Sequence, residues 1–207
     1  MKHKAYTEQD ISEVSLNDSI KRRPQLYFIE NFRNQTLDTL PFEVCCHAFD
    51  EHLDGHCHKI IITLNKDGFS IEYNAGISLK NIKPNNLPLA EMIMTEVMAC
   101  SNLKKHLAVG QEFCTTGMAI VNAASTSCKL ETIWNNKKGI FLFENGALIS
   151  KNIKSNDTND SWTKLMFKPN PEIFGDFQFT SNGIQEKIKT LNKKLPTLKI
   201  IVDDRRA

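Results

Sequence analysis

Residues 43–57 contain the side chains of this sequence that are best suited to chemistry. They read Glu-Val-Cys-Cys-His-Ala-Phe-Asp-Glu-His-Leu-Asp-Gly-His-Cys, with Glu43 and His47 four residues apart. On a helix this spacing is one turn, so the carboxylate and the imidazole lie on the same face. The cysteines and histidines could bind zinc, which takes four N or S ligands. Cys45 and Cys46 point about 100° apart on a helix, however, which places them poorly for one ion.

Apolar periodicity predicts the elements that must position this segment. A stripe of apolar side chains predicts a helix over residues 36–54, with Pro41 near its start and Gly55 as its stop. Residues 59–65 and 69–73 are rich in β-branched and aromatic residues and flank a tight turn, which predicts a hairpin. Further helices are predicted at 89–99, 118–124 and 184–195, and a meander of strands at 129–134, 139–143, 147–150 and 163–168, with a closing strand at 198–202.

The organisation and composition favour one cytoplasmic domain over residues 1–207. Helical and strand-like patterns alternate without a Pro/Gly/Ser-rich linker, which indicates an α+β domain. A net charge of +2 gives no global field that would favour nucleic acid or a membrane. We expect no signal peptide and no membrane span, because no apolar run approaches about 18 residues. The six cysteines are expected to be reduced thiols.

Three basic stretches are candidate DNA contacts, so DNA is not excluded as a partner. They lie at residues 21–23, 137–138 and 187–194. With so little net charge, they would have to converge in space to bind phosphates, and otherwise they are solvated faces.

Several segments resemble, in chain order, the N-terminal ATPase domain of the B subunits of DNA gyrase and topoisomerase IV. Residues 43–57 are similar to the family's Glu-Val-x-Asp-Asn-x-x-Asp-Glu-x-x-x-Gly helix. Residues 19–27 resemble Val-Arg-Lys-Arg-Pro-Gly-Met-Tyr, residues 89–97 resemble Ala-Ala-Glu-Val-Ile-Met-Thr, and residues 118–124 resemble Val-Ser-Val-Val-Asn-Ala-Leu. The resemblance implies a Bergerat (GHKL) fold, a mixed sheet covered on one face by helices. It further implies an N-terminal arm at 1–18, and we expect the family's transducer and DNA-cleavage domains to be absent.

In that family a Glu is the general base, an Asn holds Mg²⁺, an Asp reads adenine and a glycine-rich lid cradles the phosphates. The resemblance places Glu43 at the base position and Asp50 at the later Asp of the helix pattern. It places His47 at the magnesium position, although imidazole suits softer metals than Mg²⁺. We therefore expect no metal there.

The adenine position also departs from the family pattern. Residues 72–78 read Glu-Tyr-Asn-Ala-Gly-Ile-Ser, where the family has Asp-Asp-Gly-Arg-Gly-Ile-Pro. One residue is missing, so the adenine position holds either Tyr73 or Glu72. The alternation of the strand favours Tyr73, whose phenol would fill the adenine slot. Thr163 matches the family Thr that supports the adenine contact through water.

The lid is the least similar segment. Residues 111–117 read Gln-Glu-Phe-Cys-Thr-Thr-Gly in place of Gly-Gly-Leu-His-Gly-Val-Gly, and only Gly117 remains. Glycines let the backbone N–H groups approach phosphate oxygens, whereas Glu112 would bring a negative charge toward them. The positions implied for a nucleotide are His47, Asp50, Tyr73, Asn74, Gly76, Ile77, Gly117 and Thr163.

These departures predict a non-catalytic homologue that binds another macromolecule and needs no cofactor. The candidate protein partner is a gyrase or topoisomerase IV subunit, and we expect no ATPase activity. One alternative is a divergent nucleotide-binding protein, which would take ATP with Mg²⁺ through His47, Tyr73 and the Thr115-Thr116 loop. For Glu43 the alternative to a residual catalytic base is a surface or helix-capping carboxylate. We expect a monomer, or a dimer formed through a surface other than the family's arm.

Overall fold

The computed structural model describes residues 14–97, 105, 109, 113–158 and 160–206. Its strands are β1 (Lys59–Asn65), β2 (Gly68–Tyr73), β3 (Asn81–Ile82), β4 (Leu87–Pro88), β5 (Ser125–Trp134), β6 (Lys137–Glu144), β7 (Ala147–Ser155), β8 (Trp162–Pro169) and β9 (Lys199–Asp204). Seven of them form one sheet in the order β7-β6-β5-β8-β2-β1-β9, and β3 and β4 form a separate ribbon. Neighbours in the large sheet are antiparallel except β1 and β9, which are parallel.

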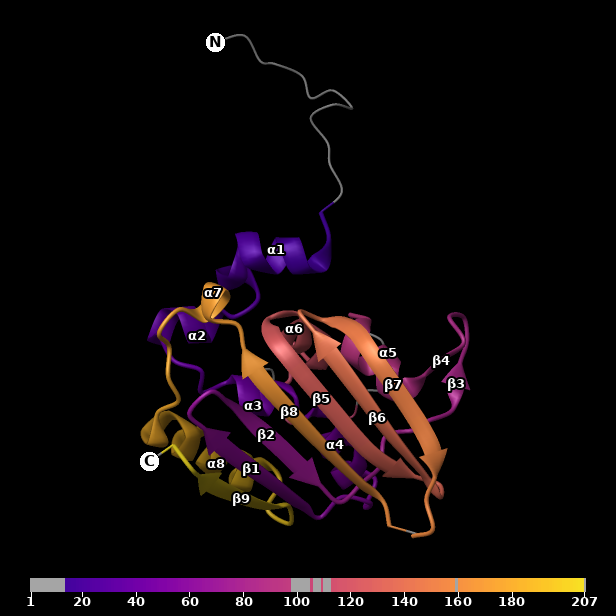
Figure 1. Ribbon diagram of the computed structural model, residues 1–207. Coiled ribbons are helices and arrows are strands. Elements are labelled where there is room, and N and C mark those ends of the chain that lie inside the picture. Colours follow the sequence, from indigo (N-terminus) through magenta and orange to yellow (C-terminus); the bar gives the residue numbers. More distant parts are fainter. Residues whose placement is uncertain (1–13, 98–104, 106–108, 110–112, 159, 207) are drawn as a thin grey trace.

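The helices form a second layer against one face of this sheet (Figure 1). They are α1 (Leu16–Arg22), the 3₁₀ helix η2 (Pro24–Leu26), α2 (Ile29–Asn34), α3 (Leu40–Glu43), α4 (Cys46–Leu53), α5 (Leu89–Thr95), α6 (Met118–Ala123), α7 (Pro171–Phe174) and α8 (Ser181–Lys194). In Figure 1, α4, α5, α6 and α8 lie behind the sheet, whereas α1, α2 and α7 lie beyond one end. The predicted fold class, an α+β sandwich with helices on one face, is confirmed. No helix in the described ranges combines the length and apolar character of a membrane span.

Alternation along β1 shows which face of the sheet the helices cover. In β1 the side chains of Ile60, Ile62 and Leu64 are buried, and the residues between them are partly exposed. The core sides of β2 and β8 continue this surface, and Tyr73 at the end of β2 is only 1 % exposed. Because successive side chains of a strand point to opposite faces, the intervening residues form an open second face.

The prediction of one helix over residues 36–54 is wrong. The structure has α3 and α4 instead, separated by Val44 and Cys45. The Cys45 N–H donates to the Phe42 carbonyl at 3.2 Å, three residues earlier, which is tighter than α-helical spacing. Leu53, expected in the buried stripe, is 42 % exposed. Glu43 is the last residue of α3. Because the helix breaks after it, its side chain need not point to the same side as those of α4.

The predicted hairpin of β1 and β2 is confirmed, with Asn65 paired to Gly68 at its turn. The predicted meander is correct only for β5, β6 and β7. Strand β8 does not continue it but lies between β5 and β2, where both neighbours help to bury its core side chains Leu165 and Phe167. The five cysteines in the described residues are free thiols, and Cys100 lies outside those residues.

Candidate functional site

Glu43, expected at the general-base position, is 5 % exposed and holds the loop that leads into α6. One carboxylate oxygen accepts the Thr116 N–H at 2.6 Å and, more weakly, the Gly117 N–H at 3.3 Å. The other accepts the Thr115 hydroxyl at 3.1 Å. Burial raises the pKa of Glu43, while these hydrogen bonds and nearby Lys187 act in the opposite direction. In this geometry the carboxylate caps the start of α6.

The capped loop lies at the positions that the resemblance assigns to the end of the phosphate-binding lid. Gly117 is the N-cap of α6 and has φ +81°, a backbone conformation that favours glycine. Backbone N–H groups just before a helix are the groups that bind anions. Here the carboxylate of the protein itself already accepts them. Gln111 and Glu112, two further departures in the lid, lie outside the described residues.

Tyr73 and His47 form a contact between the sheet and α4. The Tyr73 hydroxyl lies 3.1 Å from Nδ1 of His47, and the Nε2 of His47 lies 3.6 Å from the Glu51 carboxylate one turn later. That carboxylate favours the proton on Nε2, so Nδ1 accepts the phenolic hydrogen. The phenol therefore occupies the space between β2 and α4, and Nδ1 of His47 is already hydrogen-bonded to it.

Burial lowers the pKa of His47, although the carboxylates of Glu51 and Asp50 act to raise it. Since the unfolded chain then binds the proton more readily, stability is lost as the pH falls below the ordinary histidine pKa of 6.5. We expect wild type to lose more stability between about pH 7.5 and 5.5 than His47→Gln, as measured by urea unfolding.

Glu43 also makes stability depend on pH, in the opposite direction. Because its pKa is raised in the folded state, its contribution to stability declines as the pH rises through that pKa. Both proteins retain Glu43, so the difference between their pH profiles isolates His47. Parallel profiles would contradict a lowered pKa at His47.

Gly76 and Ile77 hold the segment after β2 against β5. A Cβ on Gly76 would lie 2.1 Å from the Ile133 carbonyl oxygen, so only glycine allows this approach. The Gly76 N–H donates to the Ser161 hydroxyl at 2.7 Å, and the Ile77 N–H donates to the Thr132 hydroxyl at 2.8 Å. Both positions are explained by the close packing of the backbone.

Asn74 and Thr163 also have partners within the protein. The Asn74 side-chain oxygen accepts the N–H groups of His58 and Lys59, at 3.0 and 2.9 Å, at the start of β1. The Thr163 hydroxyl donates to the Ala75 carbonyl at 2.7 Å. Thr163 is also the ladder partner of Tyr73. The structure thus brings Thr163 and His47 to Tyr73, and Gly117 to Glu43, whereas Asn74 is committed to the strand edge.

A hollow of about 560 Å³ lies beside Glu43 and was not expected from the sequence. Its wall includes Thr115 and Thr116, and its apolar residues include Leu26, Ile29 and Val97. The exposed fractions of these three residues are 62 %, 60 % and 47 %. They come from η2, α2 and the segment after α5, so no periodic signal in the sequence connects them.

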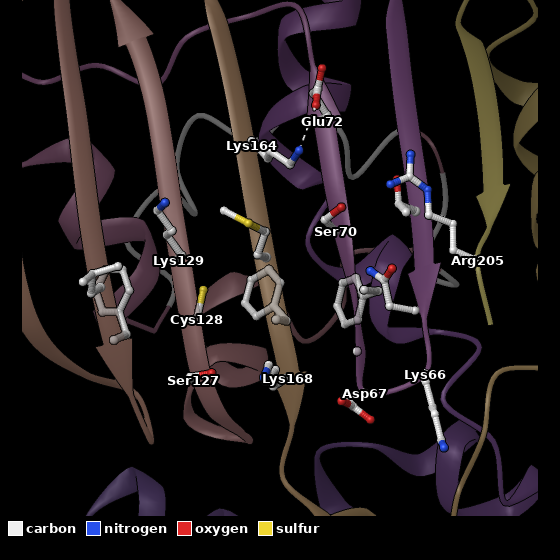
Figure 2. Close-up of a pocket in the computed structure, with 18 of the residues that line it drawn as sticks. Lys66, Asp67, Ser70, Glu72, Ser127, Cys128, Lys129, Lys164, Lys168 and Arg205 are labelled. Carbon is white, nitrogen blue, oxygen red and sulfur yellow. Dashed lines mark ion pairs between the residues drawn. The ribbon is translucent and has the colours of Figure 1, made fainter. Parts of the chain in front are cut away.

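The open face of the sheet carries a second, broader hollow of about 930 Å³. Figure 2 shows charged side chains along it, including the Lys164–Glu72 ion pair across β8 and β2, at 3.4 Å. Exposed Leu142 and Ile149 also line it. This face therefore combines internally paired charges with apolar side chains.

Metal and DNA sites are not supported by the placement of the candidate residues. Within the described part of the chain, no group of three or more His, Cys, Asp or Glu side chains is arranged to hold a metal ion. The three basic stretches lie in α1, at the β5–β6 turn and in α8, which occupy separate parts of the molecule (Figure 1). They do not form one phosphate-binding surface.

Comparison with known protein sequences finds similarity to gyrase B proteins. No family model matches the chain. The gyrase B protein of Rickettsia felis is 27 % identical over 206 residues, 98 % of this chain and 26 % of that protein. The gyrase B protein of Archaeoglobus fulgidus is 29 % identical, with coverage of 97 % and 33 %. The chain thus spans about a quarter to a third of these relatives.

The structural comparison gives the same fold. The crystal structure of the 43K ATPase domain of Thermus thermophilus gyrase B, in complex with an aminocoumarin, matches with a TM-score of 0.73. Sequence identity is 23 %, over 92 % of this chain and 49 % of that one. By its sequence matches and its fold, the chain is homologous to the N-terminal ATPase domain of gyrase B.

Proposed function

We propose that this homologue of the gyrase B ATPase domain has a degraded nucleotide site and works without catalysis, by binding another macromolecule. The observation that carries the proposal is that the Glu43 carboxylate is already hydrogen-bonded within the protein. Its carboxylate accepts the N–H groups of Thr116 and Gly117, which in an ATPase of this fold would be needed for phosphate. While the Glu43 carboxylate accepts these N–H groups, it is not available as a general base and they are not available to bind phosphate.

Charge repulsion would also oppose the binding of a nucleotide. A triphosphate that approached the loop before α6 would have to displace the Glu43 carboxylate, and until then the two negative groups would repel each other. The same loop has side chains at Thr115 and Thr116, which restrict how closely its backbone can approach a ligand.

The adenine and magnesium positions do not fit Mg²⁺-ATP either. Tyr73 is buried and hydrogen-bonded to His47, so its phenol takes the place of a carboxylate that could read an adenine amino group. His47 offers imidazole where Mg²⁺ requires oxygen, and its Nδ1 accepts the Tyr73 hydrogen. We derive no hydrolytic step for this site.

For the partner we propose a protein, with a subunit of a cytoplasmic type II topoisomerase as the first candidate. The support is the relationship to gyrase B together with the exposed apolar side chains of Leu26, Ile29 and Val97 around the hollow beside Glu43. Exposed apolar groups that gather around a concavity are typical of protein interaction sites.

The nucleotide part of the proposal is tested by isothermal titration with a non-hydrolysable ATP analogue and Mg²⁺. We expect no binding heat up to about 1 mM ligand, with a gyrase B ATPase domain as positive control. Micromolar binding that is weakened by Tyr73→Phe or Glu43→Gln would contradict the proposal and support the alternative, a divergent nucleotide-binding protein.

The partner part is tested by sedimentation of the protein mixed with purified gyrase A and gyrase B proteins. We expect a complex that Ile29→Asp weakens by at least about tenfold and that Leu53→Asp leaves unchanged. Both substitutions introduce the same charge at an exposed apolar residue, but only Ile29 lines the hollow. A gyrase partner is ruled out if neither protein binds.

A further inference from the structure

Strand β7 is one edge of the seven-stranded sheet, and no strand among the described residues pairs with its outer side (Figure 1). It is nine residues long, and every residue except Leu148 is exposed. Two of its exposed side chains are isoleucines, Ile149 at 58 % and Ile153 at 37 %. An exposed strand edge is a template for pairing with another strand.

The hydrogen-bond pattern shows which backbone groups of β7 are available. The Asn156 N–H, just after the strand, donates to the Asn136 carbonyl at 2.9 Å, so Asn156 is directed toward β6. In an antiparallel ladder the direction alternates, and the pairing is regular from Ser155 back to Ser150. Lys154 and Asn152 therefore also face β6. Lys151, Ile153 and Ser155 direct their N–H and C=O groups away from the sheet.

The lysines of β7 do not prevent another strand from pairing with it. Lys151 forms an ion pair with Glu91 of α5 at 2.7 Å, so its ammonium group lies over the helix layer. Lys154 is opposite Lys138 of β6, where two like charges face each other across the ladder. A neighbour for β7 must therefore place an uncharged or acidic residue next to Lys154.

The opposite edge is less suited to pairing. Strand β9 is shorter, and both its last two residues, Asp203 and Asp204, carry charges paired with Arg205 and Arg206. Charged side chains along an edge disfavour the addition of another strand. Of the two edges of the large sheet, β7 is the one available for a partner.

We propose that β7 pairs with β7 of a second copy of this chain, antiparallel about a two-fold axis at Ile153. In this register Ile153 is opposite Ile153 of the partner subunit, which buries two exposed apolar side chains together. Lys151 is opposite Ser155 of the partner subunit, and Lys154 is opposite Asn152 of the partner subunit. Across the proposed interface each lysine of β7 then faces an uncharged residue, and the outward backbone groups of Lys151, Ile153 and Ser155 pair.

The neighbouring registers are less favourable. An axis at Lys151 would place two lysines opposite each other, which is destabilising. An axis at Asn152 would place Lys151 opposite Ile153 of the partner subunit and lose the apolar pair. The self-complementary register is the reason that a second copy, and not an unrelated strand, is the proposed occupant. This inference does not depend on the proposed function.

Sedimentation velocity over about 5 to 500 µM protein tests the pairing. We expect wild type to form a reversible dimer. Ile153→Lys places two lysines across the axis and should raise the dissociation constant by at least about tenfold. Leu53→Lys makes the same change at an exposed apolar residue of α4 and should leave it unaltered. A wild type that stays monomeric throughout, or a dimer insensitive to Ile153→Lys, overturns the proposal.

Cysteine cross-linking tests the register itself. In Ile153→Cys the two new thiols would face each other with Cα atoms about 5.5 Å apart, which suits a disulfide. In Lys154→Cys each new thiol would instead be opposite Asn152 of the partner subunit, so oxidised glutathione should not join the two thiols. We expect a cross-linked dimer only from Ile153→Cys, measured against wild type on a non-reducing gel. Equal cross-linking of both variants overturns the register.

Discussion

Replacing Glu43 with alanine is expected to lower the free energy of unfolding by about 3 kcal/mol. The change leaves the Thr116 and Gly117 N–H groups and the Thr115 hydroxyl without their acceptor. Each unsatisfied buried donor costs about 1 to 3 kcal/mol, and water entering from the adjacent hollow reduces the total. Urea unfolding at pH 7 measures the difference.

Glu43→Gln separates the role of the acceptor from that of the charge. Its amide oxygen can still accept hydrogen bonds, and burial already disfavours the charged carboxylate, as the raised pKa shows. We expect a loss of about 1 kcal/mol, and almost none for Glu172→Ala, whose side chain is 75 % exposed. A loss below about 1 kcal/mol for Glu43→Ala would show that the carboxylate does not hold the loop.

The elements with strong local patterns were predictable from the sequence. Alternation in residues 69–73 placed Tyr73 on the inward face of its strand, and the structure shows its side chain buried. The β1–β2 hairpin followed from two apolar runs around a glycine-containing turn. In both cases the signal is short in range, because the period of a strand and the chemistry of a turn depend on neighbouring residues.

The engagement of Glu43 could not be predicted in the same way. Its partner Thr115 is 72 residues away along the chain, and the loop shows no pattern that would indicate a buried acceptor. The break between α3 and α4, which directs Glu43 toward that loop, was also missed. An apolar stripe of helical period continues across the break, and only the tight turn at Cys45 interrupts the helix. Tertiary contacts decide both features.

Two positions that the resemblance assigns to nucleotide chemistry therefore have structural partners in this chain. Glu43 stabilises the loop before α6, and Tyr73 joins β2 to α4 through His47. Each contact holds its side chain within the fold, and each adds stability that would be lost on breaking it. These contacts stabilise the fold whether or not a nucleotide binds, because a fold does not by itself fix a function.

Replacing Tyr73 with alanine should destabilise the fold even more than replacing Glu43. Tyr73 is 1 % exposed, and truncating an aromatic side chain in a packed core costs about 3 to 5 kcal/mol through lost burial and the cavity left behind. Tyr73→Phe keeps the ring and removes only the hydroxyl that reaches His47, so we expect a loss of about 1 kcal/mol. Urea unfolding of both variants measures the two contributions.

A double-mutant cycle with His47→Gln then tests whether the hydroxyl acts through His47. If the hydrogen bond is the source of the effect, Tyr73→Phe should cost almost nothing in the His47→Gln background, because its partner has changed. An additive result would mean that the hydroxyl stabilises the fold independently of His47, through another neighbour such as Thr163. The resemblance assigns Tyr73 and His47 to the adenine and magnesium positions, so under the proposed function a nucleotide would have to supply at least the energy of this hydrogen bond to open the site.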